Sequence, residues 1–275
     1  MCKSLVLDCD GGGDIMHTRR IAVRCLAFLF ITSVACKAGI EAKRKLVDNG
    51  SYAQMLDSDD VYLTTDDAVS KYYDEQVKQT IVSEYNRMRS INSDTVGWIY
   101  ISDTQINYPI MSGDNNYYLN YTPYRERAFR GSIFLDQNQL EINELSLLHG
   151  HNMLNGSMFS HIKKFKEKAF FDSHNVLIYD GTNFKVYKPQ GIMRVKETAT
   201  FKYNIQDKKE LQAYGEELKS QSFLKSADPI TEDDILLINT CVSDGTGEHH
   251  ILIAQEIARD TLTEDIEDTS STAEE

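Results

Sequence analysis

The chain has 275 residues and a formal net charge of -13, which is enough length for one sizeable domain with extensions or for two small ones. The negative charge argues against nucleic acid as a partner, because proteins that bind phosphates carry a surplus of lysine and arginine. Apolar residues make up 41% of the sequence, as in a folded globular protein rather than a disordered one.

The first apolar segment, residues 21–40, predicts a membrane anchor. Its uncharged core, Cys25 to Cys36, is shorter than the about 20 residues of a spanning helix, but the basic residues beside it can extend it by snorkelling. Two arginines precede the segment, which favours a cytoplasmic N-terminus for residues 1–20 and an uncleaved single-pass anchor in the cell membrane, with the rest of the chain extracellular. A cleaved signal peptide is the alternative. We expect residues 1–15 to come from a translation start upstream of the natural one at Met16.

A polar tether and a helix follow the anchor. Residues 41–67 are polar, with an acidic patch, and we expect them to link the anchor to a folded domain over residues 68–258. From residue 68 to residue 89 apolar side chains recur every three or four residues, which predicts an amphipathic helix. The apolar positions are Val69, Tyr73, Val77, Ile81, Tyr85 and Met88. Asp66 or Asp67 could cap this helix.

After Asn92 the apolar residues alternate, and this period of two predicts β-strands. The expected strands are 95–101, 106–111, 132–136, 145–150, 176–180, 184–196, 235–241 and 250–258, interrupted by helices at 156–171 and 207–224. About eight strands bounded by turn residues predict a mainly β domain, either a closed barrel or a sandwich. Residues 259–275 contain seven acidic side chains and few apolar ones, which predicts a disordered tail.

Cysteine is unevenly distributed along the chain. Four of the five cysteines lie in the first forty residues, and Cys241 is the only one between residues 41 and 275. We therefore expect no disulfide framework, and the absence of zinc-type Cys/His spacing predicts no metal site. A lone cysteine often only fills space in a core. Cys241, however, ends a predicted strand just before the turn 243–247, where a thiol would be accessible, and this position favours a nucleophile.

A nucleophilic cysteine needs a partner that favours the thiolate, usually a histidine. Two pairs of histidines lie at strand ends, where active sites on β scaffolds tend to be built. The first pair is His149 and His151, and the second is His249 and His250, which begin the strand after Cys241. The simpler interpretation of each pair is a rim histidine that hydrogen-bonds a loop carbonyl.

Several motifs, taken in chain order, match one family. The upstream motifs are Val96-Gly97-Trp98-Ile99, Ile106-Asn107-Tyr108-Pro109, Asp114-Asn115-Asn116-Tyr117-Tyr118-Leu119 and Gly131-Ser132-Ile133-Phe134-Leu135-Asp136. They are followed by a histidine segment, Gly150-His151-Asn152-Met153, and a cysteine segment, Asn239-Thr240-Cys241. From about Val69 to Ile257 the chain resembles the class B sortases.

This resemblance implies a closed eight-stranded sortase-type β-barrel with an N-terminal helix and an inserted helix before the cysteine strand. It also implies a membrane-anchored cysteine transpeptidase of Gram-positive surfaces. Such an enzyme cleaves a C-terminal sorting motif, of the Asn-Pro-x-Thr type in class B, and holds the surface protein as a thioacyl-enzyme. It then passes that protein to an amine of peptidoglycan or of a pilin lysine. Neither a metal nor an organic cofactor is expected.

Carried over to this chain, the family roles make Cys241 the nucleophile. His151 becomes the general acid for the leaving amine and later the base for the incoming one. Thr240 matches the position that supports the oxyanion. Asn115 and Leu119 match loop positions that line the substrate groove. His149 stands where the family commonly has tyrosine, and we group it with the substrate-binding residues.

One departure from the family concerns an arginine that faces the thiol from the start of the last strand. The alignment places His250 there, with His249 as the alternative, and no arginine lies between Cys241 and Arg259. Arginine holds a permanent charge and a fork of donors, whereas neutral histidine offers a single donor. We therefore expect reduced activity.

Two other functions stay open on the sequence. One is a sortase-fold protein with weak or no catalysis that binds peptides in surface assembly. The other is a different cysteine cell-wall peptidase. Strand order weakens the second, because those folds place the cysteine early and the histidine later, whereas here His151 precedes Cys241 by about ninety residues.

Overall fold

The computed structural model describes residues 71–203, 205, 207–242 and 245–261. The predicted cytoplasmic segment, anchor and tether therefore lie outside the described residues, as does most of the predicted acidic tail. The part of the chain that the structure describes contains no helix long and apolar enough to cross a membrane.

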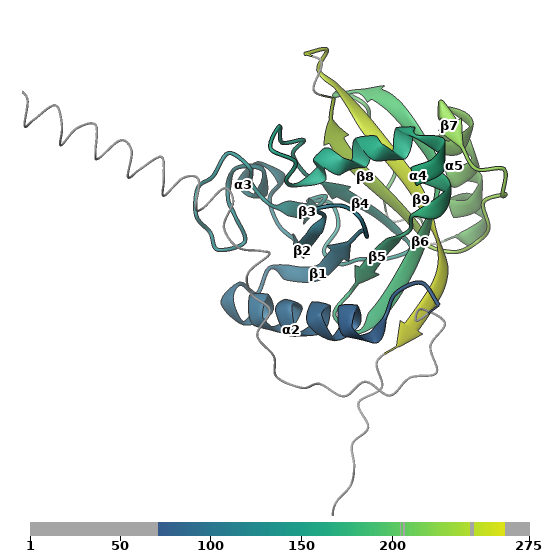
Figure 1. Ribbon diagram of the computed structural model, residues 1–275. Helices are drawn as coiled ribbons and strands as arrows, with labels where there is room; N and C mark the ends of the chain where they lie inside the picture. The colour runs from purple at the N-terminus through teal and green to yellow at the C-terminus, as the bar shows by residue number, and fades with distance from the viewer. Residues whose placement is uncertain (1–70, 204, 206, 243–244, 262–275) are drawn as a thin grey trace, which may run out of the picture. The chain divides into compact units, whose positions relative to one another are not determined.

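Among the described residues nine strands form one sheet, and eight of them close into a barrel (Figure 1). The order around the barrel is β5 (Val176–Tyr179), β1 (Thr95–Tyr100), β2 (Asn107–Met111), β3 (Ile133–Leu135), β4 (Leu145–His149), β8 (Ile235–Cys241), β9 (Glu248–Thr261) and β6 (Asn183–Lys196). Pairing between β6 and β5 closes the barrel, and the two-residue strand β7 (Leu224–Lys225) pairs with β6. The predicted fold class, a closed eight-stranded barrel, is confirmed.

The strand pairings bring the ends of β4, β8 and β9 together. Strands β4 and β8 run parallel, so that their C-terminal ends meet and His149 lies opposite Asn239. Strands β8 and β9 run antiparallel, with Cys241 opposite His249. Residues 239 and 241 are two apart on one strand and therefore face the same side of the sheet.

Helix α2 (Glu75–Ile91) covers β1, β5 and β6 on one side of the barrel (Figure 1). Its buried stripe includes Ile81, Val82 and Met88, which pack against Trp98 and other side chains of those strands. The helix begins later than predicted, because Asp74 caps it by accepting a hydrogen bond from the Val77 backbone N–H at 2.9 Å.

Helix α5 (Lys208–Ser220) is the inserted helix expected before the cysteine strand. Asp207 caps it, accepting from the Glu210 backbone N–H at 2.8 Å. Its apolar stripe packs on one face of β4, β8 and β9, and the residues in this cluster include Leu145, Leu147, Leu211, Tyr214, Leu218, Ile235, Leu237, Ile251 and Ile253. The same face continues along the strands to His149, Asn239 and Cys241.

The remaining helices differ from the prediction. The segment 156–171 is not one helix but a 3₁₀ helix, η1 (Phe159–Lys166), followed by α4 (Lys168–Ser173), and the two are separated by an extended Glu167. Helix α3 (Asn115–Asn120) was expected to be a loop. Its six residues are too short to show a helical period, and its polar start suggests a turn.

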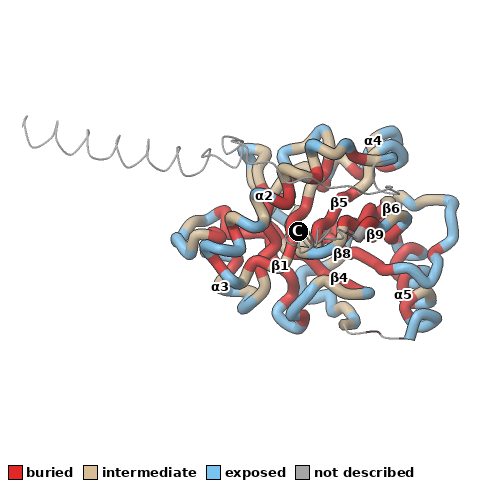
Figure 2. Tube along the Cα trace, turned by 90° about the horizontal axis from the view of Figure 1, so that it is seen from below, coloured by how far each residue is buried: buried red, intermediate tan, exposed pale blue. Residues whose placement is uncertain are grey.

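Strand β9 extends to Thr261, beyond the predicted strand end at residue 258. Arg259 forms ion pairs with Asp234 at 2.8 Å and with Glu256 at 2.7 Å, which hold this end of the strand. The segment predicted as a disordered tail therefore begins with three residues of strand. Buried positions concentrate in the barrel strands, whereas the exposed positions lie in loops and on outer helix faces (Figure 2).

Candidate active site

Cys241 ends β8 and presents a free, exposed thiol. Its backbone is held from two sides. The Asn152 side-chain amide donates to the Cys241 carbonyl at 2.8 Å, and beyond the cysteine the Val242 N–H donates to the Glu248 carbonyl at 2.7 Å. The thiol is therefore exposed at the barrel rim, on a strand end whose backbone is held by hydrogen bonds.

The imidazole that faces this thiol belongs to His249. Its Nε2 lies 3.6 Å from Cys241 Sγ, within hydrogen-bonding reach of sulfur. The alignment of the last strand had placed His250 there. Successive residues on a strand point to opposite faces, so His250 shares the other face with Thr240, its partner in the register. His250 is buried there, with its ring centroid 6.3 Å from that of Phe223.

A chain of side-chain hydrogen bonds runs back from His249. Its Nδ1 lies 2.8 Å from Asn239 Oδ1, and Asn239 Nδ2 lies 3.0 Å from His149 Nδ1. His149 Nε2 lies 2.9 Å from Asp136 Oδ2. We call Asp136, His149, Asn239, His249 and Cys241 the Asp136–Cys241 chain.

Asp136 anchors the far end of this chain just after β3. Its Oδ1 accepts from the Asn138 backbone N–H at 3.0 Å and side-chain amide at 2.7 Å, and its Oδ2 accepts from Asn115 at 3.2 Å. Burial opposes ionisation, but hydrogen bonds from His149, Asn138 and Asn115 outweigh it and hold the pKa of Asp136 well below its usual range. The carboxylate therefore stays charged at any physiological pH. Asn115, which is predicted to line the groove, is the donor of the 3.2 Å hydrogen bond to this carboxylate.

His151 occupies a separate position beside the thiol strand. Its Nε2–H donates to the Leu119 carbonyl at 3.0 Å, and its ring stacks on the exposed Phe129, with centroids 5.5 Å apart. Burial lowers the pKa of His151, although the hydrogen bond to Leu119 opposes the shift. Within the described residues no hydrogen bond joins His151 to Cys241. The predicted groove residue Leu119 therefore contacts the predicted acid through its backbone.

Thr240 does not present its hydroxyl to the thiol. The residue is buried on the face opposite Cys241, and its Oγ1 has no hydrogen-bond partner among the described residues. Only its backbone can act on the same side as Cys241. The predicted oxyanion role is therefore limited to main-chain groups at this position.

Electrostatics favour a neutral thiol and a neutral imidazole at rest. Burial and the carboxylate of Glu197 raise the pKa of the Cys241 thiol. Burial lowers the pKa of His249, with Glu197 opposing and His149 adding to the shift. Because the two shifts move the thiol and imidazole pKa values apart, the thiolate–imidazolium pair is a minor state until a reaction requires it.

Two members of the chain, Asp136 and Asn239, had no role in the sequence analysis. Asn239 could have been found from strand alternation, since it lies two residues before the cysteine on the same face. Asp136 gave no such signal, because its proximity depends on strand pairing. Among the described residues no cluster of histidine, cysteine and carboxylate side chains is arranged to hold a metal ion.

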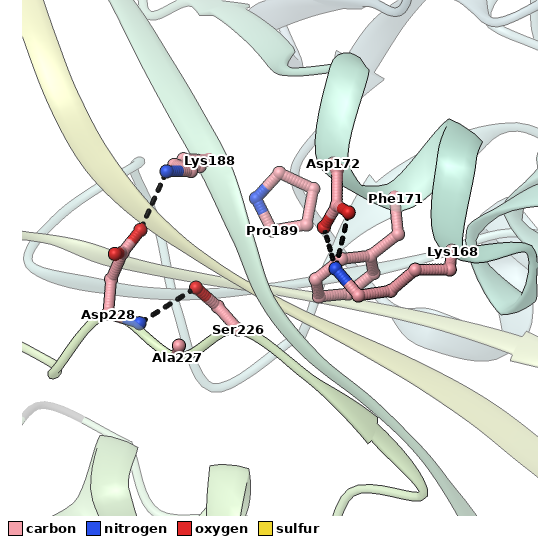
Figure 3. A pocket seen from close by; sticks show the side chains of 8 residues that line it. All are labelled: Lys168, Phe171, Asp172, Lys188, Pro189, Ser226, Ala227 and Asp228. Carbon is pink, nitrogen blue, oxygen red and sulfur yellow. Dashed lines mark hydrogen bonds and ion pairs between the residues drawn. The ribbon is translucent and has the colours of Figure 1, made fainter.

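The structure also contains a pocket of about 250 Å³ lined by α4, the middle of β6 and the segment after β7 (Figure 3). Lys168 pairs there with Asp172, and Lys188 pairs with Asp228 at 2.6 Å. The charges balance within the pocket, and none of its residues belongs to the Asp136–Cys241 chain. The exposed thiol, rather than this pocket, marks the candidate active site.

Comparison with known proteins supports this choice. A model of the sortase domain matches residues 99–257. Sortase B of Listeria monocytogenes is 30% identical over 237 residues, which cover 82% of this chain and 93% of that protein. Sortase B of Staphylococcus aureus is 31% identical over 165 residues, covering 58% of this chain and 67% of that protein. A solved mutant form of Clostridium perfringens sortase B aligns with a TM-score of 0.58 at 30% identity, covering 66% of this chain and 90% of that structure.

Proposed function

Because this chain belongs to the sortase family, within class B, and is thus a cysteine transpeptidase, we propose that it cleaves a C-terminal sorting motif of the Asn-Pro-x-Thr type. The cleaved surface protein is transferred to an amine of peptidoglycan or of a pilin lysine. The observation that carries this proposal is the exposed Cys241 thiol at a strand end, with a histidine nitrogen 3.6 Å away.

In the first half-reaction Cys241 attacks the threonine carbonyl of the sorting motif. The C–S bond forms as the C–N bond breaks, and the departing amine gains a proton. The protonated form of His151 delivers that proton from Nδ1, because its Nε2–H is already donated to the Leu119 carbonyl. The product is a thioester that retains the surface protein on the enzyme.

In the second half-reaction an amine attacks the thioester. The nitrogen loses a proton as the new amide bond forms, and Cys241 leaves as the thiol once it regains a proton. His151 accepts the proton of the incoming amine, which reverses its first role. The net reaction exchanges one amide for another and needs neither a metal nor an organic cofactor.

The location proposed for this activity is the outer face of a cell membrane. Residues 21–40 would anchor the chain, with residues 1–20 cytoplasmic and the barrel outside. The support is the sequence pattern of an apolar segment preceded by arginines. Transfer of surface proteins to a cell wall also requires an extracellular domain.

One observation favours a second candidate, a peptide-binding module with weak catalysis. The arginine that the family places opposite the thiol is replaced by His249, and Arg259 lies at the other end of β9, paired with Asp234 and Glu256. A neutral imidazole stabilises an oxyanion less than a guanidinium does.

Intact-mass spectrometry of the full-length protein with a panel of sorting-type peptides tests the first function against the second. Transpeptidation predicts a mass increase equal to the peptide up to its threonine, and its loss in Cys241→Ala. If no peptide forms an adduct while Cys241 still reacts with iodoacetamide, the binding module is the better description.

A further inference from the structure

We propose that His249 is the base that takes the proton of Cys241, and that Asp136, His149 and Asn239 are positioning residues that fix its tautomer. The place of this step in transpeptidation rests on the proposed function, whereas the proton transfer itself does not. His249 is a catalytic residue in this scheme because it touches the reacting sulfur. The other three act through it.

The chemistry of each group determines which atom donates and which accepts at every hydrogen bond of the Asp136–Cys241 chain. An ionised Asp136 can only accept, so His149 must donate from Nε2. A neutral His149 then has its lone pair on Nδ1, and that lone pair accepts from the Asn239 amide N–H. The amide oxygen of Asn239 in turn accepts from His249 Nδ1–H. The lone pair of His249 is thereby left on Nε2, the atom that faces Cys241 Sγ at 3.6 Å.

This arrangement is prepared for proton uptake. When Nε2 of His249 gains the thiol proton, Nδ1 already donates to Asn239 and no hydrogen bond in the chain has to reverse. Donors and acceptors that need no reorganisation during reaction contribute most to catalysis.

The atoms and electrons of the step balance within the known reaction. The S–H bond breaks, a bond from His249 Nε2 to hydrogen forms, and the electron pair stays on sulfur to attack the carbonyl. In the first half-reaction His249 gains the thiol proton and a protonated His151 gives one to the leaving amine. In the second half-reaction His151 regains a proton from the incoming amine and His249 returns its proton to the sulfur. No further reactant is required.

The charged groups around the pair come from several elements. Glu197, just after β6, acts on both Cys241 and His249. His149 on β4 acts on His249. Glu248, the neighbour of His249 on β9, is engaged in an ion pair with Arg194 of β6. Among the described residues the hydrogen bonds of the His249 ring go to Asn239 and Cys241, both members of the Asp136–Cys241 chain.

The test measures alkylation of Cys241 by iodoacetamide across pH 5 to 10 in the full-length protein, read from the mass of the peptide that carries Cys241. The wild type should show a plateau between the pKa values of His249 and of the thiol, because the fraction of thiolate–imidazolium pair is constant there. His249→Gln should remove the plateau, lowering the rate at pH 7 by about tenfold or more. An unchanged profile would overturn the proposal.

Variants of the positioning residues separate tautomer control from simple packing. In Asp136→Asn the new amide can donate to His149. Every hydrogen bond in the Asp136–Cys241 chain can then reverse its direction, which places the Nε2–H of His249 against the sulfur. The plateau should fall in Asp136→Asn and Asn239→Ala, whereas the rate at high pH, where the thiol ionises without help, should not change. The matched histidine control is His174→Gln. His174 is the C-cap of α4 and does not belong to the Asp136–Cys241 chain.

A measurement on the wild type avoids any effect of substitution on folding. The ¹⁵N chemical shifts of His249 should show a protonated Nδ1 and an unprotonated Nε2 at pH 8. A protonated Nε2 would contradict the inference. Loss of the plateau in His249→Gln without any peptide adduct in the wild type would reject the proposed function alone. If His249→Gln forms the peptide adduct at the wild-type rate, the role of His249 as base is rejected and the proposed function stands.

Discussion

Cys241 Sγ and His249 Nε2 lie 3.6 Å apart because β8 and β9 are registered so that these two residues are direct partners. A shift of one residue in that register would turn His250 toward the thiol and His249 away. The contact is therefore a property of strand pairing and does not depend on a flexible side chain reaching across the site.

Replacing Cys241 with alanine should abolish the acyl-enzyme and leave the barrel folded. The residue is exposed at the strand end, so the change in unfolding free energy should stay within about 0.5 kcal/mol. Intact mass with a sorting-type peptide and thermal unfolding measure the two effects. Transpeptidation that persists in Cys241→Ala would refute the assignment of the nucleophile.

The strands, the helix before the cysteine strand and Cys241 itself could be predicted from the sequence because each depends on a local pattern. The alternation of apolar and polar residues predicts the barrel strands, and the turn that follows an apolar run predicts that the thiol lies at the barrel rim. The Asp136–Cys241 chain could not be predicted this way. It requires the parallel pairing of β4 with β8 and the exact partners on β8 and β9, which are contacts between residues far apart in sequence.

The one-residue error at His250 has the same origin. Aligning the last strand on its apolar residues does not determine which of two adjacent histidines faces the thiol, since the turn before the strand sets the register. The family motifs predict Cys241 as the nucleophile and His151 as its acid, but they contain no counterpart of a second imidazole at the thiol.

His151 and His249 should affect different steps. His151→Gln should slow peptide acylation by at least about a hundredfold, because the leaving amine lacks its acid, yet it should keep the iodoacetamide plateau of Cys241. His249→Gln should lose that plateau. Measuring both rates on both variants gives a two-by-two comparison, and identical losses for the two variants would show that the roles are not separate.

His250→Arg should destabilise the protein rather than supply the missing arginine. His250 is only 5% exposed, and a permanent charge placed there without a designed partner should cost about 2 kcal/mol or more. His249→Arg, at the half-buried neighbouring position, is the matched control and should unfold closer to the wild type. Urea unfolding of both variants checks this, and a fully stable, faster His250→Arg enzyme would show that the last strand had been placed one residue out.

The end of β9 should be a structural part of the domain. Lys78 on α2 is completely buried and pairs with Glu75 at 2.8 Å and with Asp260 at 3.2 Å. Asp260→Ala leaves this ammonium with less compensation, so it should lower the unfolding free energy by about 3 kcal/mol. Urea unfolding measures the loss.

The control for Asp260→Ala is the exposed pair of Lys188 with Asp228. Exposed ion pairs contribute little, so Lys188→Ala should leave the urea midpoint almost unchanged. Equal effects of the two substitutions would mean that the end of β9 contributes no more to folding than a surface pair.

Asp136 should make the stability of the protein dependent on acid pH. Its hydrogen bonds hold the folded-state pKa below the unfolded value, which is about 3.9. The folded state therefore binds fewer protons than the unfolded state near that pH. The contribution is fully present above the unfolded pKa and is lost as pH falls toward the folded pKa.

Compared with Asp136→Asn, the wild type should be more stable by about 2 kcal/mol at pH 6, and the difference should shrink steadily below about pH 4. Urea unfolding of both proteins at several pH values between 2.5 and 6 gives the curve. Asp172→Asn, whose partner Lys168 forms an exposed pair on α4, is the control and should show a much smaller pH-dependent difference. A difference that grows as pH falls would mean that Asp136 is protonated in the folded protein, and the direction assigned to the hydrogen bonds from Asp136 to His249 would then have to be abandoned.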